Sequence, residues 1–351
     1  MSILVPARNE ASNIARCIRS LLNQDYRNYE LLVLDDHSED ATASIVEMLA
    51  HQSEDPEKRL RLIKGEELPE GWLGKNFACY QLAQAAQGQF LLFTDADTSH
   101  NVNSVSSAVA ALYREDAYFL SLFPLQQTVS MAERLVVPLV QGFVYGLLPT
   151  WLVARNPNPA YSAANGQFML FNSETYQLIG GHQAVKDVVL EDVVLGRRMK
   201  QAGFKSLLLD GRDTVSCRMY RSSTDVWRGF SKNFFAFFNF ELGWMVLFLL
   251  LNLLAFVFPY FWLLLGFLIR QPPVAEWLWF PLAQIALGLI QRLLLCLRFS
   301  FHPLDIFLHP VSIIYMTAIG INSARWSRNG TEWKGRRYLF NSPGFKSQNK
   351  S

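Results

Sequence analysis

The sequence predicts an α/β protein with a mostly parallel sheet, followed by a membrane region. Short apolar runs typical of strands alternate with helical patterns over residues 2–209, and residues 234–324 are nearly all apolar. Strands separated by helices of this length predict a mainly parallel sheet that is covered by helices on both faces. An apolar stretch of about 20 residues is long enough to span a bilayer.

Each predicted element follows from a local pattern of apolar residues. The predicted strands are residues 2–5, 30–34, 60–63, 89–93, 118–123, 168–171 and 205–209. The predicted helices are residues 13–22, 42–49, 76–87, 102–112 and 191–201. Three further stretches have the length and composition of membrane spans, namely residues 242–269, 277–297 and 306–324. The third carries His309 and Pro310, and we expect it to be re-entrant or to lie in the membrane plane.

Composition limits the classes of protein that fit. Half of the 351 residues are hydrophobic and 18% are charged, against roughly 25% charged in ordinary soluble domains. The net charge of +2 gives no support to a nucleic-acid partner, which needs a clustered basic face. We therefore expect a soluble domain over residues 1–233, a transmembrane region over residues 234–324 and a basic polar tail over residues 325–351.

Residues 135–154 form a fourth uncharged stretch, which we expect to lie in the membrane interface. Pro138 and Gly142 make it a poor straight helix. If it crossed the bilayer, Asp97 and Asp192 would lie on opposite sides, and no site could contain both. An apolar segment in the plane of the membrane is suited to guiding a lipid acceptor.

Two carboxylates, Asp95 and Asp97, follow a strand of large apolar residues in Thr94-Asp-Ala-Asp97. Ligands of parallel sheets bind at the carboxyl ends of strands. Two carboxylates at this spacing suit Mg²⁺ or Mn²⁺, which takes oxygen ligands and substrate phosphates. The alternative is that the pair caps a helix beginning near Asn101.

Asp35 and Asp36 end another predicted strand, where a carboxylate suits the donor groups of a base or ribose. The alternative is a turn in which Ser38 or Asp40 caps the next helix. His37 is more typical of a structural residue than of a ligand.

Glu191 and Asp192 begin a predicted helix. Acids there are favoured by the helix dipole, by roughly 0.3–1 kcal/mol, which is one interpretation. The other is that one of them is a general base. Gly71-Trp-Leu-Gly-Lys75 is a glycine-bracketed loop, whose Lys75 is suited to a phosphate or is simply solvated.

Taken together and in this order, these segments resemble the family 2 glycosyltransferases, and within them a membrane-bound branch. The match covers about residues 2–235. The segments 71–79 and 163–171 are similar to those of carotenoid-acid (diaponeurosporenoate), hopanoid-associated and ceramide glycosyltransferases. Residues 226–233 lie where that group carries a Gln-x-x-Arg-Trp motif. Here the order is Trp227-Arg228 without the Gln, which argues against a processive synthase.

The resemblance implies a GT-A fold in the soluble domain, which is then the catalytic domain. It also implies an inverting transfer of one sugar from a nucleotide sugar, with a UDP-sugar favoured, to a hydroxyl or carboxyl of a membrane lipid. Asp192 is implied as the catalytic base with Glu191 beside it, and Asp95 and Asp97 as metal ligands. The implied donor contacts are Pro6, Ala7, Asn9, Glu10, Asp35, Asp36, Lys75, Asp95, Ala96, Trp227 and Arg228.

Other classes of function remain open at this point. A polysaccharide synthase of the same family fits less well, because the spans are few. A membrane-anchored protein that binds a nucleotide sugar without catalysis would not need all of these acids. A transporter would usually place ionisable residues deep in its spans, whereas residues 242–269 have no charge. We expect a multi-pass membrane protein whose catalytic domain is on the cytoplasmic side.

Overall fold

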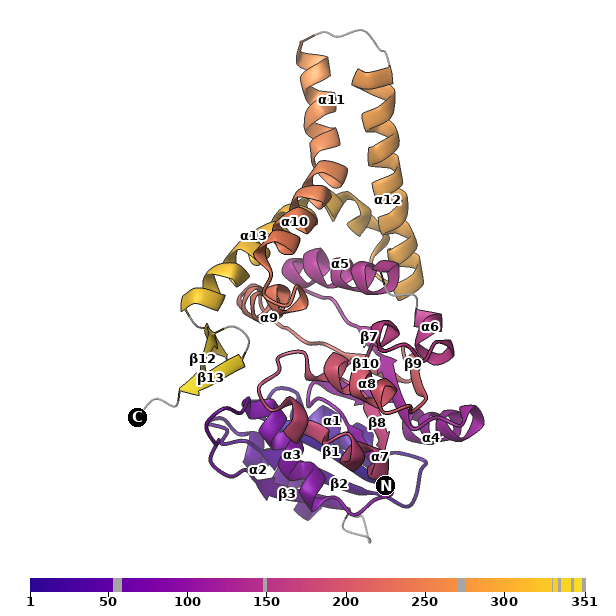
Figure 1. Cartoon of the computed structure of the whole chain (residues 1–351), viewed down its shortest axis with the longest axis vertical. Coiled ribbons are helices and arrows are strands. Elements are labelled where there is room, and N and C mark those ends of the chain that lie inside the picture. The colour runs from indigo at the N-terminus through magenta and orange to yellow at the C-terminus, as the bar shows by residue number, and fades with distance from the viewer. Residues whose placement is uncertain are drawn as a thin grey trace. The chain divides into compact units, whose positions relative to one another are not determined.

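The computed structural model describes residues 1–52, 59–147, 150–269, 275–329, 331–333, 336–341 and 344–348. It divides into two compact units (Figure 1). The first contains residues 1–127, 148–219 and 332–351, and the second contains residues 128–147 and 220–331. The predicted boundary after residue 233 differs from this division, because the helix Ser223–Phe237 packs on the last long helix of the second unit.

The strands of the first unit are β1 (Ser2–Ala7), β2 (Glu30–Asp35), β3 (Leu60–Lys64), β4 (Phe90–Phe93), β5 (Thr98–His100), β6 (Phe119–Phe123), β7 (Leu125–Gln126), β8 (Met169–Asn172), β9 (Ser206–Asp210) and β10 (Val215–Cys217), followed in the tail by β11 (Thr331–Trp333), β12 (Arg336–Asn341) and β13 (Gly344–Gln348). The main sheet has the order β3-β2-β1-β4-β8-β6-β9. Among the described residues of this sheet, β8 alone runs antiparallel to its neighbours. The prediction of a mostly parallel sheet is confirmed.

The helices of the first unit are α1 (Ile14–Leu22), α2 (Thr42–Gln52), α3 (Gly74–Ala85), α4 (Ser104–Glu115), α6 (Thr150–Arg155), η1 (Pro159–Tyr161), α7 (Ser173–Leu178), η2 (Gly181–Val185) and α8 (Glu191–Gln201). The strands contribute side chains to two hydrophobic cores, one on each face of the sheet, because successive side chains of a strand point to opposite faces. Ile3 and Val5 of β1 pack with α1, α2 and α4, whereas Leu4 packs with α3, α7 and α8. The predicted helices therefore do cover both faces of the sheet.

The second unit contains α5 (Met131–Leu147), α9 (Ser223–Phe237), α10 (Leu242–Phe256), α11 (Phe258–Leu268), η3 (Ala275–Trp279), α12 (Phe280–Phe299), η4 (Pro303–Leu308) and α13 (His309–Asn329). The segments 276–299 and 303–327 are long and apolar enough to cross a membrane. The helices α9 and α10 together form a third candidate, bent by 116°. C-terminal membrane helices were predicted, and the candidates found here support membrane association.

Two predicted apolar segments are divided in the structure. Residues 242–269 form α10 and α11, which meet at Val257. Pro259 explains the break, because proline has no N–H to continue the bonding of the preceding helix. Residues 135–154 contribute to α5 and α6, which fall in different units.

The helices α11 and α12 stand side by side in Figure 1 and pack on each other. The rings of Trp262 and Trp277 stack at 4.7 Å between centroids. Large apolar side chains such as Leu254, Phe261 and Leu264 are exposed on α10 and α11. Exposed apolar surface of this extent marks an interaction or membrane surface, which fits the membrane prediction.

An ion pair between the partly exposed Arg134 and the buried Asp305 holds α5 within the second unit. The Arg134 guanidinium donates through Nε (2.9 Å) and Nη2 to Oδ1 of Asp305, which is fully buried. Arg292, also fully buried, donates from Nη2 to the carbonyl oxygen of Arg134 at 2.7 Å. The charged side chains of α5, α12 and η4 thus meet at one place.

Reversing one charge of this pair is expected to destabilise the second unit. Arg134→Glu sets a second carboxylate against the buried Asp305, and a buried charge that loses its partner costs about 3–5 kcal/mol. The double variant Arg134→Glu/Asp305→Arg should recover part of that loss. Thermal unfolding in detergent measures it, with Lys205→Glu as the control, because the exposed Lys205–Glu115 pair should contribute about 1 kcal/mol or less. Equal unfolding temperatures for Arg134→Glu and Lys205→Glu would contradict this prediction.

Candidate active site

The first unit gathers its acidic residues at the carboxyl ends of neighbouring strands. Asp35 is the last residue of β2 and Asp95 follows β4, and both strands pair in parallel with β1. The next helix after β4 is α4, which begins at Ser104 beyond β5. Asp95 and Asp97 are therefore not helix caps, and the alternative interpretation of this pair is wrong.

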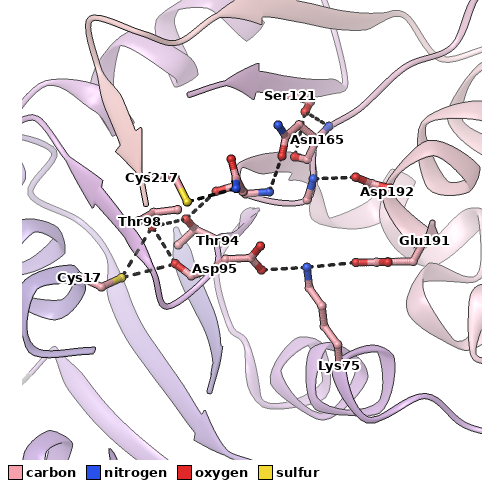
Figure 2. Close-up of polar contacts among 12 residues, drawn as sticks. Cys17, Lys75, Thr94, Asp95, Thr98, Ser121, Asn165, Glu191, Asp192 and Cys217 are labelled. Atoms are coloured by element: carbon pink, nitrogen blue, oxygen red, sulfur yellow. Dashed lines mark hydrogen bonds and ion pairs between the residues drawn. The ribbon is translucent and has the colours of Figure 1, made fainter. Parts of the chain in front are cut away.

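Lys75 lies between two of the predicted acids, as Figure 2 shows. It belongs to the first turn of α3, and its Nζ is 2.8 Å from Oδ1 of Asp95 and 3.2 Å from Oε1 of Glu191. Burial opposes the charge of the ammonium, but Asp95 and Glu191 together outweigh burial and raise the pKa of Lys75 well above its ordinary value. Lys75 is therefore paired with two acids in a helix and is not simply solvated in a loop, and its ammonium keeps its positive charge throughout the physiological range.

Asp192 differs from its neighbour Glu191 in its partners. Its Oδ2 accepts a hydrogen bond from the backbone N–H of Gly166 at 2.9 Å, and its Oδ1 accepts one from Val193 at 2.8 Å. Burial and then the charge of Glu191 raise the pKa of Asp192 to about 7, against the opposing effects of Lys75 and of the two amides. Two acids in one helical turn therefore have different environments, and Asp192 has the pKa that suits a general base near neutral pH.

Gly166 completes this cluster, although the sequence indicated only that its segment resembles that of relatives. A Cβ atom at Gly166 would lie 3.1 Å from Nζ of Lys75 and 3.6 Å from both Oδ2 of Asp192 and Oε1 of Glu191. A Cβ atom here would therefore crowd the Lys75 ammonium and touch both carboxylates. The glycine between Asn165 and Gln167 was the available signal, because a glycine often marks a close approach to the backbone.

Asn76 holds α3 against the segment that leads into α8. This side chain is buried, and its Nδ2 donates to the carbonyl oxygens of Val185 at 2.7 Å and Val188 at 2.9 Å. The contact places the first turn of α3 beside the first turn of α8, so that Lys75 can reach Glu191. Asn76 belongs to the segment 71–79, for which the sequence indicated a resemblance but no role for this residue.

The predicted nucleotide segments lie together after β1 and β2. Asn9 joins them, because its N–H donates to Oγ of Ser38 at 2.9 Å and its Oδ1 accepts from the N–H of Glu39 at 2.8 Å. Arg8 donates to the carbonyl oxygen of Asp36 at 2.6 Å. Asp36 is buried. Pro6, Ala7, Glu10 and Asp35 occupy the same strand ends and the turns that follow them, whereas Ala96 lies between Asp95 and Asp97 in the turn after β4.

Asp40 caps the helix α2, as expected if this segment contains a turn in which Ser38 or Asp40 is the cap. Its Oδ1 accepts from the backbone N–H of Thr42 at 2.9 Å, at the start of α2. The helix start is therefore satisfied by Asp40, and Asp35 and Asp36 are not needed for it. Their predicted contacts with base and ribose stay predictions.

The donor set at Asp95 and Asp97 fits a divalent cation that shares its ligands with a substrate. Asp95 directs its carboxylate toward Lys75, and the Asp97 carboxylate lies beside the buried Cys217 thiol, whose pKa is raised first by burial and then by Asp97 and Asp95. Within the described ranges no group of three or more His, Cys, Asp or Glu side chains could hold a metal. Mg²⁺ is commonly bound through one or two carboxylates plus phosphates and water, and these residues suit that arrangement.

Trp227 and Arg228 belong to the second unit. The Trp227 ring packs against Tyr315 of α13 at 5.6 Å between centroids, and Arg228 is exposed on α9. The structure therefore gives Trp227 a packing partner within its own unit, and the predicted contact of both residues with the donor stays a prediction.

Known proteins that resemble this chain are glycosyltransferases. Residues 2–130 match the family model described as glycosyl transferase family 2. The mannosyltransferase PcManGT from Pyrobaculum calidifontis, solved in complex with GDP-Man and Mn²⁺, superposes with a TM-score of 0.52 at 18% identity, covering 93% of this chain and 86% of that one. The fold is therefore of the GT-A type, as predicted.

Two relatives carry the same name, 4,4'-diaponeurosporenoate glycosyltransferase. The protein from Staphylococcus haemolyticus (strain JCSC1435) is 26% identical over 230 residues, which is 63% of this chain and 57% of that protein. The protein from Staphylococcus aureus (strain MRSA252) is 25% identical over 346 residues, covering 96% of this chain and 88% of that protein. The chain thus aligns with little more than half the length of the first relative. The predicted resemblance is confirmed, since residues 2–130 match the family 2 model and the chain is similar to these named glycosyltransferases.

Proposed function

We propose that this protein transfers one sugar from a nucleotide sugar, with UDP favoured, to a hydroxyl or carboxyl group of a membrane lipid. The observation that carries the proposal is Asp192, fixed by two backbone amides beside the cluster of Lys75, Asp95 and Glu191. The relatives named for 4,4'-diaponeurosporenoate support a carotenoid-type acceptor. The exposed apolar helices of the second unit support a lipid acceptor more generally.

The proposed reaction is a single inverting displacement. Asp192 accepts the proton of the acceptor hydroxyl as its oxygen attacks the anomeric carbon, and the bond from that carbon to the nucleoside diphosphate breaks. Mg²⁺ or Mn²⁺ at Asp95 and Asp97 would neutralise charge on the departing diphosphate. Lys75 adds a second positive charge beside Asp95, and Glu191 holds that lysine in place.

A transfer assay with purified protein tests the proposal. A panel of labelled UDP-sugars is offered with a carotenoid acid, a hopanoid alcohol and a ceramide, and the label is followed into the organic phase. We expect one sugar per lipid on one acceptor class. Label appearing only in a polymer would favour a polysaccharide synthase, and nucleotide binding without turnover on any acceptor would favour a non-catalytic binding protein. Lipid analysis of a deletion strain, in which one glycolipid should disappear, identifies the natural acceptor.

We further propose that α10–α11 and α12 cross the bilayer as a hairpin and that the catalytic domain is cytoplasmic. Two crossings return the chain to the side on which it began, which suits the basic residues after residue 324, since Lys and Arg favour the cytoplasm. The packing of α13 on α5 and α9 favours a position in the interface for residues 306–324. Residues 135–154 are likewise proposed to lie in the interface through α5.

Cysteine labelling is expected to place the tail on the cytoplasmic side. Ser351, which lies outside the described residues, is changed to Cys and treated with an impermeant maleimide in right-side-out and inverted vesicles. The four native cysteines are buried, so the unmodified chain is the background control. Labelling only from the outer face would mean that three crossings exist.

A further inference from the structure

We propose that Thr94 is a positioning residue whose hydroxyl ties the turn at Asp95–Asp97 to the tripeptide Asn165–Gly166–Gln167, which holds Asp192. The proposal rests on the proposed function, because it assigns to Thr94 the spacing between the predicted metal ligands and the predicted base. Thr94 is the residue before Asp95 and is 1% exposed.

The first part of the link lies in the turn at Asp95–Asp97, called the acidic turn below. The Oγ1 of Thr94 donates to the carbonyl oxygen of Gln167 at 2.8 Å, and the Oγ1 of Thr98 donates to that of Asp95 at 2.7 Å. The Nε2 atom of His100 lies 3.1 Å from the first hydroxyl and 3.0 Å from the second. Since each hydroxyl has one proton and directs it to a carbonyl, the bond with His100 must use its Nε2–H. Thr94 is thus held from two sides, which fixes the direction of its own donor.

The second part of the link is the tripeptide (Figure 2). Gln167 is buried, with its Nε2 3.1 Å from Sγ of Cys217 and its Oε1 accepting from Nε2 of Gln126 at 2.7 Å. The neighbouring amide of Gly166 donates to Asp192. The turn at Asp95–Asp97 is therefore joined to the base in three steps. Thr94 bonds to the carbonyl of Gln167, Gln167 follows Gly166 in the chain, and the amide of Gly166 bonds to Asp192.

Removal of the Thr94 hydroxyl takes away the donor to the buried carbonyl of Gln167, whereas the Nε2–H of His100 keeps the hydroxyl of Thr98 at 3.0 Å. A buried polar group that loses its partner is strongly disfavoured, so the segment at Gln167 is expected to move relative to the turn at Asp95–Asp97. Because the chemistry needs the base and the leaving group in one geometry, a shift of about 1 Å can reduce turnover about 100-fold.

The test compares Thr94→Val, which keeps the shape, with Thr94→Ser, which keeps the hydroxyl. The matched control is Thr175→Val. Thr175 is also a buried threonine, 4% exposed, whose hydroxyl donates to a backbone carbonyl, that of Asn172 at 3.0 Å, but in α7. Three quantities are measured on each variant: the pH profile of transfer, the affinity for Mn²⁺ with UDP by electron paramagnetic resonance, and the unfolding temperature.

For Thr94→Val we expect turnover to fall by roughly 10- to 100-fold, a changed midpoint in the pH profile and weaker Mn²⁺ binding. Thr94→Ser should stay within about threefold of the parent, since its hydroxyl can make the same bond. Thr175→Val should lower the unfolding temperature about as much as Thr94→Val does. It should change neither the midpoint of the pH profile nor the affinity for Mn²⁺. If Thr94→Val does not fold, Thr94→Ala takes its place as the variant without a hydroxyl.

The proposal is overturned if Thr94→Val matches Thr175→Val in pH midpoint and Mn²⁺ affinity, because Thr94 would then serve only stability. It is also overturned if Thr94→Ser is as impaired as Thr94→Val. A parent protein that binds UDP and Mn²⁺ but transfers no sugar would contradict the proposed function instead. In that case the Mn²⁺ measurement on the same variants still decides whether Thr94 holds the acidic turn.

Discussion

Replacing Asp192 with asparagine should lower transfer to a hydroxyl acceptor by roughly 10²–10⁴-fold, the usual contribution of a positioned base. Asparagine keeps the size of the side chain and an oxygen that can accept from Gly166 or Val193, but it cannot take up the proton. The loss corresponds to roughly 3–5 kcal/mol of barrier at 1.36 kcal/mol per tenfold. Donor affinity, measured by calorimetry with UDP, should change little, because Lys75 and the acidic turn remain.

The pH profile provides a second measurement of the same residue. Asp192 must be deprotonated to act as a base, and its pKa is raised to about 7 by burial first and then by Glu191. Transfer should therefore fall about tenfold for each pH unit below that value and level off above it. In Asp192→Asn this acidic limb should be absent, so the residual rate should be nearly flat with pH. A limb that persisted unchanged in the variant would assign the base to another group.

Glu191→Gln is the matched control, because it changes the adjacent acid of the same helical turn. Its loss should be milder, since glutamine can still accept a hydrogen bond from Lys75, whose Nζ is 3.2 Å from Oε1 of Glu191. A dead Glu191→Gln with a normal Asp192→Asn would reverse the assignment. The acceptor matters too, because a carboxyl acceptor is already ionised at neutral pH and needs no base. A small effect of Asp192→Asn with a carotenoid acid, together with a large effect with a lipid alcohol, would separate the two acceptor classes.

The main sheet was predictable from the sequence because its signals are local. The strand predicted at residues 30–34 is found as Glu30–Asp35, and the helix predicted at residues 13–22 is found as Ile14–Leu22. Short strands such as Leu125–Gln126 and Val215–Cys217 were not predicted. Two or three residues are too few to show the alternation of side chains on which such a prediction rests.

The partners of Lys75 show where the sequence alone was insufficient. Its segment predicted a loop and a phosphate contact, whereas the structure sets Lys75 in the first turn of α3 between Asp95 and Glu191. That arrangement depends on Asn76 and on carbonyls more than 100 residues further along the chain. Contacts between such distant residues leave no periodic pattern in one sequence.

The membrane region shows the same limit in another form. Apolar composition indicated three stretches of spanning length, but composition does not reveal that Pro259 divides the first of them or that α13 packs along α5 and α9. The Arg134–Asp305 pair joins residues that are 171 positions apart. No local pattern around either residue indicates that the two meet.

Loss of either acid of the turn after β4 is expected to reduce transfer at least 100-fold. A divalent cation contributes several kcal/mol of charge stabilisation to a departing diphosphate, and each 1.36 kcal/mol is tenfold in rate. Asp95 already shares its charge with Lys75 at 2.8 Å, so we expect Asp97 to be the closer ligand. Asp97→Asn should then weaken Mn²⁺ binding in the presence of UDP more than Asp95→Asn does. Chelation of the parent protein should abolish transfer, and added Mn²⁺ or Mg²⁺ should restore it.

Asp210→Asn is the control for these variants. Asp210 also ends a strand of the main sheet, but its carboxylate pairs with Arg212 at 2.9 Å, outside the cluster around Lys75. Its replacement should leave both the rate and the Mn²⁺ affinity within about twofold, because an exposed ion pair contributes little. Undiminished transfer in excess EDTA would rule out the metal. In that case Lys75, the cation already in contact with Asp95, would be the group left to stabilise the departing diphosphate, and Lys75→Met should then cause the loss expected here of Asp97→Asn.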